Sequence, residues 1–297
     1  MGEGGAPYFP GAPPEGQAHA MSADPPATTT DSLLDGALRL RQPLRGHRVG
    51  TDAILLAAAA PMAAADRLID IGAGVGAVGL AMAQRSAGAQ VMLVEIDAAL
   101  ATLAQENAVL NNLGERVRVI AADFMSAPER RKAGLAAGAA DLIVTNPPFF
   151  EPERVRASAD ASRARAHVLE DAGGAHPLRR WIVAALALLA PGGCFVMIHR
   201  PEALPVILAA CARRLGSLAI LPVHPHADAP AHRLLIGGVK GARGPLRLLP
   251  ALALHEPKGG FTPLAQAIHR GETTIDLDLP RRARRDNARV DPSRASD

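Results

Sequence analysis

Aromatic residues are scarce in this chain of 297 residues, at 3% of the total with a single Trp. Trp181 and the pair Phe149-Phe150 are therefore more informative than such residues usually are, although Trp181 is expected only to pack on a helix. The chain has only two cysteines, Cys194 and Cys211, and both stand in apolar runs. This excludes a disulfide framework and the cysteine spacing of a zinc site, and it favours the reducing cytoplasm. We expect both thiols to be buried.

Long hydrophobic runs and a strong charge of one sign are also lacking. The apolar runs that end at Pro61 and Pro191 are too short for the ~20 residues of a membrane span. The N-terminus lacks the basic segment and apolar stretch of a secretory signal. The net charge of +3 is compatible with a nucleic-acid partner but does not require one. With 48% hydrophobic residues, the chain can bury the core of one large α/β domain or two small ones.

Both ends of the chain have the composition of disordered segments. Residues 1–30 are rich in Gly, Pro, Ala and Thr without any helical or strand period, and Met21 is a plausible alternative start. Residues 273–297 form a polar tail rich in arginine. We therefore expect one folded domain over residues 31–272.

Strands and helices alternate through this domain. Strands are expected at 67–71, 90–94, 116–121, 141–145 and 194–198, and helices at 53–60, 77–84, 98–111, 177–189 and 201–214. Strands at 218–223 and 233–239 have no helix between them and predict a hairpin at the sheet edge. Residues 244–270 are expected to add one more strand, a turn and a short helix. The pattern predicts a mostly parallel, seven-stranded Rossmann-like sheet with helices on both faces and an antiparallel edge hairpin.

Polar groups follow the first three strands at the edge where open α/β sheets bind ligands. The first strand carries Asp70 and runs into a turn with Gly72, Gly74 and Gly76, which lets backbone N–H groups approach a ligand. This spacing differs from the dinucleotide pattern G-x-G-x-x-G. Glu95 ends the second strand, where a carboxylate can bind both hydroxyls of a ribose. Asp123 follows the third strand, where it could meet an adenine amino group, so the series suits an adenosyl ligand.

The fourth strand stops at Asn146-Pro147-Pro148-Phe149. The prolines have no N–H with which to continue a ladder, so they predict a rigid loop at the ligand-binding edge. The Asn146 side-chain oxygen and the Pro147 carbonyl can accept the two hydrogens of an exocyclic amine, while Phe149 stacks on the ring. The loop therefore suits a flat base that carries an exocyclic amine.

The order of these motifs resembles the S-adenosylmethionine-dependent methyltransferases of the large seven-stranded class, and Asn146-Pro147-Pro148-Phe149 is similar to the motif of their amino-methylating members. Residues 48–56, 70–74 and 104–107 resemble the bacterial tRNA adenine-N6 methyltransferases that act on valine tRNA beside the anticodon. The similarity covers residues 45–240. It departs at Phe149, where many members carry Tyr; stacking survives this change, whereas a phenolic hydrogen bond does not.

The resemblance implies a set of site residues and a cofactor. It implies S-adenosyl-L-methionine, no metal, and catalysis by Asn146, Pro147, Pro148 and Phe149. The expected cofactor-binding residues are Thr51, Asp52, Asp70, Gly72, Gly74, Gly76, Glu95, Asp123 and Asn146. Thr51 is also the expected N-cap of the helix that follows it.

The expected partner is an RNA, with tRNA favoured, bound by a cytoplasmic monomer. Arg154, Arg156, Arg163 and Arg165 lie in a loop, 154–165, that could grip phosphates together with the C-terminal tail. A plain solvated loop explains these arginines equally well. His224, His226 and His232 lack the accompanying Cys or carboxylate pattern of a metal site.

Several other functions remain open. The amine could be guanine N2 of rRNA, an adenine of DNA or a glutamine amide of a protein. The last two fit less well, because the chain has no room for the recognition domain or the leading helical domain that such enzymes carry. A nucleotide-binding oxidoreductase would not explain the Asn-Pro-Pro-Phe motif. An RNA-binding protein without catalysis would use the arginine segments alone.

Overall fold

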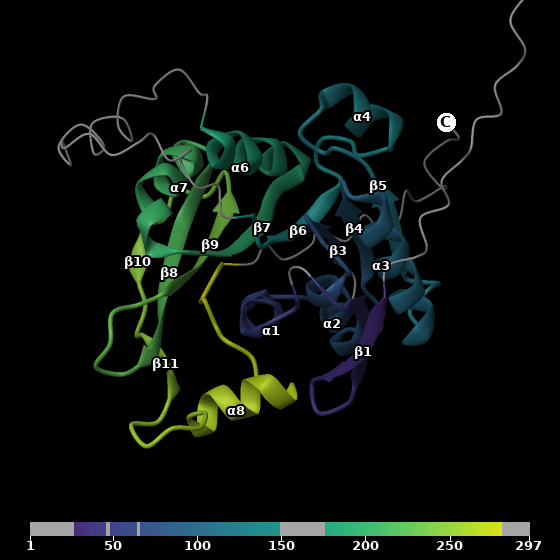
Figure 1. The fold of residues 1–297 in the computed structure, drawn as a ribbon. Helices are drawn as coiled ribbons and strands as arrows, with labels where there is room; N and C mark the ends of the chain where they lie inside the picture. The colour runs from purple at the N-terminus through teal and green to yellow at the C-terminus, as the bar shows by residue number, and fades with distance from the viewer. Residues whose placement is uncertain (1–26, 46–47, 64–65, 149–175, 281–297) are drawn as a thin grey trace, which may run out of the picture.

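A computed structural model describes residues 27–45, 48–63, 66–148 and 176–280. Its main sheet has the strand order β10-β8-β9-β7-β6-β3-β4-β5, with β11 beside β8 (Figure 1). The strands are β3 (Arg67–Ile71), β4 (Gln90–Glu95), β5 (Val117–Ala121), β6 (Ala140–Thr145), β7 (Leu189–His199), β8 (Leu215–His226), β9 (Arg233–Lys240), β10 (Arg247–Leu248) and β11 (Leu252–His255). Strand β9 runs antiparallel to both of its neighbours, and the other pairs in this sheet are parallel.

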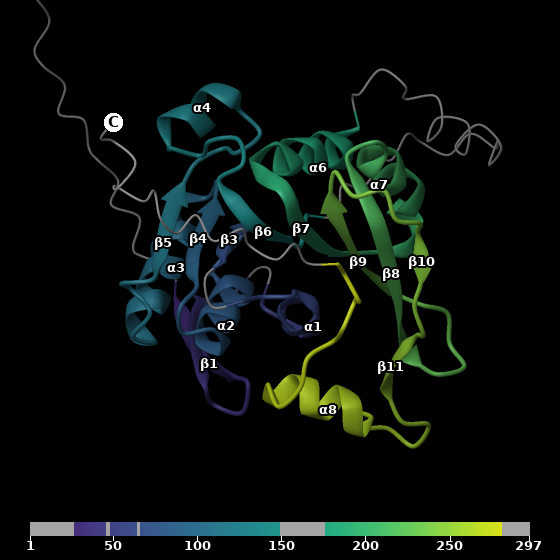
Figure 2. The same ribbon diagram turned by 180° about the vertical axis from the view of Figure 1, so that it is seen from behind.

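Helices cover both faces of the sheet, as the alternation of elements predicts. The helices are α1 (Thr51–Ala59), α2 (Ala77–Arg85), α3 (Ala98–Leu110), α4 (Ala127–Lys132), α6 (Pro177–Leu188), α7 (Leu204–Cys211) and α8 (Pro263–Arg270), with a short 3-10 turn, η1 (Pro201–Ala203). Helices α6 and α7 lie across the sheet from α1 and α8, as the view from behind also shows (Figure 2). Of these described helices, none combines the length and the apolar character that a membrane crossing requires.

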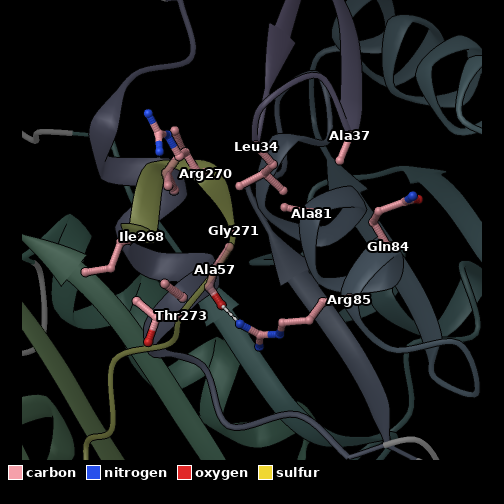
Figure 3. Close-up of a pocket in the computed structure, with 12 residues that line it drawn as sticks. Leu34, Ala37, Ala57, Ala81, Gln84, Arg85, Ile268, Arg270, Gly271 and Thr273 are labelled. Atoms are coloured by element: carbon pink, nitrogen blue, oxygen red, sulfur yellow. Dashed lines mark hydrogen bonds between the residues drawn. The ribbon is translucent and has the colours of Figure 1, made fainter. Parts of the chain in front are cut away.

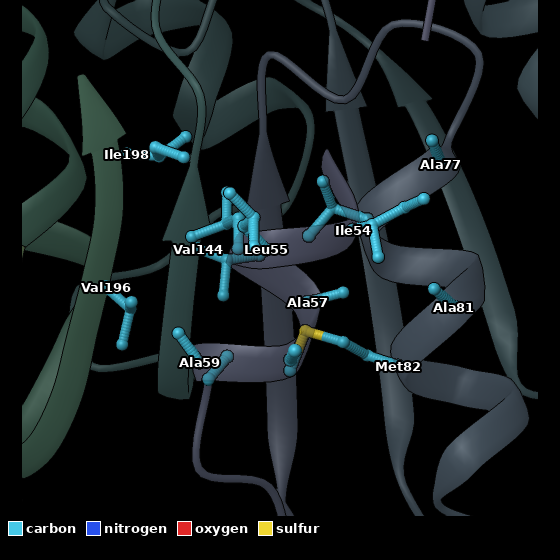
Figure 4. Close-up of a cluster of buried hydrophobic side chains, with 14 of the residues drawn as sticks. Ile54, Leu55, Ala57, Ala59, Ala77, Ala81, Met82, Val144, Val196 and Ile198 are labelled. Atoms are coloured by element: carbon cyan, nitrogen blue, oxygen red, sulfur yellow. The ribbon is translucent and has the colours of Figure 1, made fainter. Parts of the chain in front are cut away.

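The core has two parts because successive side chains of a strand point to opposite faces. On β6, Leu142 and Val144 join the cluster under α1 and α2, whereas Ile143 joins the cluster under α6 and α7. Figure 4 shows the first cluster, where side chains of α1 lie between those of β6 and β7 and those of α2. Both cysteines are buried, as expected, and they do not form a disulfide. Burial raises the pKa of the Cys211 thiol to about 12.

The predicted seven-stranded core is confirmed as β3 to β9, including the β8–β9 hairpin. The hairpin is not the outer edge of the sheet, however, because β10 and β11 both pair with β8 in parallel. The sequence predicted one strand in this region where the structure has two short ones. The described sheet therefore has nine strands rather than seven.

A two-stranded hairpin precedes the domain's first helix, where the sequence predicted disorder up to residue 30 and then a short amphipathic piece. Strands β1 (Thr28–Leu33) and β2 (Leu38–Pro43) pair antiparallel, and alternate residues of β2 are buried. Asn107 of α3 and Asn111, the C-cap of that helix, hold β2. Asn107 exchanges hydrogen bonds with the backbone N–H and C=O of Arg41 (2.7 and 2.9 Å), and Asn111 does the same with Arg39 (2.9 and 2.7 Å).

The chain after α8 is packed as far as Leu279, beyond the predicted domain boundary at residue 272. The backbone N–H of Ile275 donates to Ala58 O at 3.0 Å. Leu277 and Leu279 are buried and would meet a Cβ added at Gly237 of β9. Alternating apolar residues at 275, 277 and 279 explain why this extended segment packs on the sheet rather than joining the polar tail. The segment 281–297 lies outside the described residues, as do residues 1–26.

Candidate active site

The three glycines of the turn after β3 all have positive φ, at 70° for Gly72, 56° for Gly74 and 90° for Gly76. The three positions differ in their surroundings. A Cβ at Gly72 would lie 2.9 Å from the Trp181 ring, and one at Gly76 would lie 2.9 Å from a methyl of Leu93. A Cβ at Gly74 would meet nothing within 4 Å. Gly72 and Gly76 therefore allow close packing, whereas Gly74 faces open space in which a ligand can approach the backbone.

Glu95, at the end of β4, holds this turn in place. Its Oε2 accepts a hydrogen bond from Gly74 N at 2.7 Å, and its Oε1 accepts one from Asp97 N at 2.9 Å. Glu95 is buried, with an exposed fraction of 8%. A carboxylate offers about four acceptor positions, so two remain for the ribose hydroxyls expected from the sequence.

Asp70 lies beneath the turn and is 2% exposed. Its Oδ2 accepts a hydrogen bond from Gly79 N of α2 at 2.9 Å. Burial raises the pKa of the Asp70 carboxyl to about 7; the bond from Gly79 opposes this shift and the charge of Glu95 adds to it. Asp70 therefore ties β3 to α2 and supports the turn from below.

Asp123 follows β5 and caps the turn that leads to α4. Its Oδ1 accepts from Met125 N at 2.8 Å, and its backbone N–H donates to Glu129 Oε2 at 2.9 Å. The adjacent Phe124 is buried and meets Trp181 edge to face, with ring centroids 4.6 Å apart. Asp123 is thus held at the same edge of the sheet as the glycine turn.

The end of β6 is fastened to the end of β3. Strand register places Thr145 opposite Ile71, so that Asn146 and Gly72 follow a paired position. The Thr145 hydroxyl donates to Ile71 O at 2.8 Å and accepts from Trp181 Nε1 at 3.0 Å. Asn146 is half-buried, Pro147 is buried and Pro148 is exposed. Phe149 lies outside the described residues, so its stacking role stays a prediction.

Trp181 is the site residue that sequence reasoning missed. From α6 it lies against Gly72, Thr145 and Phe124, which belong to three different strand ends. The sequence predicted only that it packs on its helix. The sequence feature that could have indicated this role is that Trp181 is the single Trp of a chain poor in aromatic residues.

Thr51 and Asp52 lie at the start of α1 but are engaged with other elements. The prediction that Thr51 is the N-cap is wrong: Gly50 occupies that position, and it has no side chain to form a cap. The Thr51 hydroxyl lies 3.3 Å from His269 Nε2 of α8, and Asp52 accepts from Arg233 Nε at 2.8 Å. Arg233 begins β9 at the same edge of the sheet as Asn146, because its neighbour Leu234 pairs with His199, the last residue of β7. Cofactor contacts by Thr51 and Asp52 stay a prediction.

Neither a cavity elsewhere nor a metal competes with this edge as the candidate site. An apolar cavity of about 150 Å³ lies between the tip of the β1–β2 hairpin, α1, α2 and α8 (Figure 3). Arg85 borders it and donates to Ala57 O at 2.9 Å. A second cavity of about 350 Å³ lies between the end of α1, Arg85 and residues 274–279. Ligand pockets usually measure about 300–1,000 Å³, so only the second cavity reaches that size, and neither cavity is lined by a predicted site residue. Within the described part of the chain, no group of three or more side chains could hold a metal ion.

The fold and the strand-end groups define a methyltransferase of the seven-stranded, S-adenosylmethionine-dependent class. Residues 47–175 match the family model of the Methyltransferase small domain. The structure is similar to the crystal structure of a predicted O-methyltransferase from Agrobacterium tumefaciens, with a TM-score of 0.63 and 30% identity over 76% of this chain and 98% of that one.

Two curated relatives define the family more closely. The tRNA1(Val) (adenine(37)-N6)-methyltransferase of Serratia proteamaculans is 36% identical over 64% of this chain and 69% of its own length. The protein of the same description from Pectobacterium carotovorum is 33% identical over 64% of this chain and 73% of its own. This chain belongs to the methyltransferase family that includes these two proteins. Its methyl donor is S-adenosyl-L-methionine, as the class predicted from the sequence requires.

Proposed function

We propose that this protein methylates the exocyclic N6 of an adenine in RNA, with an adenine of a tRNA anticodon loop as the favoured target. The observation that carries this proposal is the register of β3 and β6, which sets Asn146 beside Gly72 across a pair of hydrogen-bonded strands. A donor bound over the glycine turn and an amine bound at Asn146 would then face each other. The relatives named for tRNA adenine-N6 methylation support the choice of amine and of RNA.

The cofactor's binding site is built by the first three strand ends. Gly74 leaves space beside its backbone, Glu95 has free acceptor positions for the ribose, and Asp123 can meet the adenine amino group. When bound, S-adenosylmethionine supplies an electrophilic methyl group on a sulfonium. The role of the protein is to hold that methyl in line with the acceptor nitrogen.

Asn146 and Pro147 would prepare the acceptor amine. An exocyclic amine of adenine is a weak nucleophile because its lone pair is conjugated with the ring. Hydrogen bonds from its N–H groups to the Asn146 side-chain oxygen and the Pro147 carbonyl favour a pyramidal nitrogen and stabilise the developing positive charge. The nitrogen gains the methyl group before it loses a proton to solvent, so no basic residue is required first.

An unpaired base suits this site better than a paired one. Extruding a base from a duplex costs a few kcal/mol, and base stacking on an aromatic ring returns about 1–3 kcal/mol. An adenine in a loop avoids most of that cost. The arginines of loop 154–165 and the C-terminal tail lie outside the described residues, so their contact with RNA stays a prediction, as do the monomeric state and the cytoplasmic location.

The proposal is tested in four separate reactions, each of which contains the purified protein and S-adenosylmethionine. The added substrate is tRNA, rRNA, duplex DNA or release-factor protein. Mass spectrometry of the digested products identifies the modified residue. We expect N6-methyladenosine in tRNA. N2-methylguanosine in rRNA, or methylated DNA or glutamine with no change to tRNA, would overturn the assignment.

A further inference from the structure

Four rings from different elements form a continuous stack on the side of the sheet that holds β8 and β11. His226 ends β8, His255 ends β11, Phe261 precedes α8, and His269 lies in the last turn of α8. Ring centroids are 5.6 Å apart between His226 and His255, 4.9 Å between His255 and Phe261, and 4.2 Å between Phe261 and His269. The last two pairs are nearly parallel, at 16° and 26°. We call these four side chains the ring ladder.

The backbone fixes the order of the ring ladder. The parallel register of β11 and β8 sets His255 opposite His226, and an antiparallel bridge joins His255 to Phe261. His269 is oriented by contacts of its two ring nitrogens with Ala265 O at 2.8 Å and Thr51 Oγ1 at 3.3 Å. The rings are therefore held in place before any ligand arrives, which lowers the entropic cost of binding.

The ring ladder lies at the same edge of the sheet as Asn146. Strands β6 and β8 run in the same direction, because β9 is the antiparallel strand of the sheet. His226, the last residue of β8, and Asn146, which follows β6, therefore lie at the same edge of the sheet. A series of contacts joins the two places. Arg233, which begins β9 opposite Val223 of β8, bonds Asp52, and the neighbouring Thr51 meets His269. Figures 1 and 2 show α8 below α1 and beside β11 in both views.

The chemistry of these rings suits nucleobases. Phe261 is 39% exposed, which is unusual for a residue type that proteins mostly bury, but its two faces are covered by His255 and His269. A further flat ring would therefore stack on an outer face of the ring ladder, that of His226 or of His269. Lys258 is exposed in the turn between His255 and Phe261 and can meet a phosphate, whereas Arg270, which follows His269, lies 3.9 Å from the carboxylate of Glu272. Metal binding does not explain the histidines, because the described residues contain no group of three ligands.

We infer that the ring ladder is a stacking platform for unpaired bases of the RNA substrate, next to the adenine that is methylated. The inference rests on the proposed function, since it assigns the RNA a second contact at the edge of the sheet where Asn146 lies. Stacking on aromatic rings tolerates any base, so the ring ladder adds affinity and orientation without reading the sequence.

The test compares Phe261→Ala, Phe261→Leu and Phe261→Trp with the wild type. Binding of a fluorescein-labelled anticodon stem-loop RNA is measured by anisotropy, and binding of S-adenosylmethionine by calorimetry. We expect the RNA Kd to rise about tenfold in the Ala and Leu variants, because loss of the central ring breaks the ring ladder on which a base would stack, and to stay near the wild-type value in the Trp variant, which restores a central ring. The Kd of S-adenosylmethionine should be unchanged in all three. Val109→Ala removes a more exposed apolar side chain, 64% exposed against 39% for Phe261, at the far end of α3 and should leave RNA binding unchanged.

Failure of the inference is distinguishable from failure of the proposed function. If the wild type binds the RNA and forms N6-methyladenosine, but Phe261→Leu binds the RNA equally tightly, the ring ladder has no such role. If the wild type neither binds nor methylates RNA, the proposed function fails and the inference falls with it. Phe261→Leu keeps an apolar side chain at this position, so it decides the question even if the Ala variant does not fold.

Discussion

The indole N–H of Trp181 donates a hydrogen bond to the Thr145 hydroxyl at 3.0 Å, and Thr145 is the residue before Asn146. The same hydroxyl donates to Ile71 O at 2.8 Å, one residue before Gly72. Two hydrogen bonds on one buried oxygen thus connect α6, the end of β6 and the end of β3. The placement of Asn146 relative to the glycine turn depends on this connection.

Replacing Thr145 tests that dependence. Thr145→Val keeps the shape and removes both hydrogen bonds, each of which contributes about 1 kcal/mol to the free energy of unfolding. We expect kcat to fall roughly tenfold or more, because small displacements of a positioning group are costly in the transition state. Thr145→Ser keeps the hydroxyl and should remain near the wild-type rate. A Val variant with full kcat would contradict the positioning role; steady-state kinetics and urea unfolding provide both measurements.

Alanine substitutions in the glycine turn should distinguish a glycine that is required for packing from one that leaves room for a ligand. Alanine at a positive φ costs roughly 1–2 kcal/mol at any of them. Gly72→Ala must also displace the Trp181 ring, so we expect it to lose more unfolding free energy than Gly74→Ala. Gly74→Ala should instead weaken S-adenosylmethionine binding, because its Cβ enters the space beside the turn.

A matched control exists for the backbone strain. Gly36, in the β1–β2 turn, also has a positive φ, 86°, with nothing within 4 Å of an added Cβ. Gly36→Ala should lose similar stability to Gly74→Ala without any change in cofactor affinity. Equal calorimetric Kd values for the two variants would argue against a ligand beside Gly74.

Asp70 predicts a pH dependence of stability. Its pKa in the folded protein is raised to about 7, above the usual unfolded value near 4, so the folded state binds the proton more tightly. The stability contributed by this group is fully present below the unfolded pKa and is lost as pH rises through about 7. The unfolding free energy of the wild type minus that of Asp70→Asn should therefore fall by more than about 1 kcal/mol between pH 5 and pH 8. Urea titrations at a series of pH values measure this difference, and parallel curves for the two proteins would refute it.

Features that depend on local pattern could be predicted from the sequence. The strands of the seven-stranded core are short Val/Ile/Leu runs, and the ends of several are marked by glycines, carboxylates or prolines. The glycine turn, Glu95 and the Asn146 loop were therefore found from sequence alone, and the structure places them at one edge of the sheet.

Features that depend on distant partners could not be predicted. Only residues 38–41 of the β1–β2 hairpin alternate clearly between apolar and charged, and the hairpin is held by asparagines 66 and 72 residues further along the chain. The packed segment 273–280 has a tail-like composition, and its alternating leucines matter only because β9 lies beneath them. The position of Thr51 just before the predicted helix suggests an N-cap, whereas its bond to His269, 218 residues away in the sequence, depends on the tertiary fold. The ring ladder likewise exists only once β8, β11 and α8 come together.

The most direct test of the central claim compares Asn146→Ala with Glu95→Ala. For Asn146→Ala we expect the rate of N6-methyladenosine formation to fall by about 100-fold or more, while the Kd of S-adenosylmethionine stays within a few-fold of wild type. For Glu95→Ala we expect the reverse order of effects, with cofactor binding weakened most. An Asn146→Ala variant that methylates at a near-wild-type rate would contradict the assignment of the amine site.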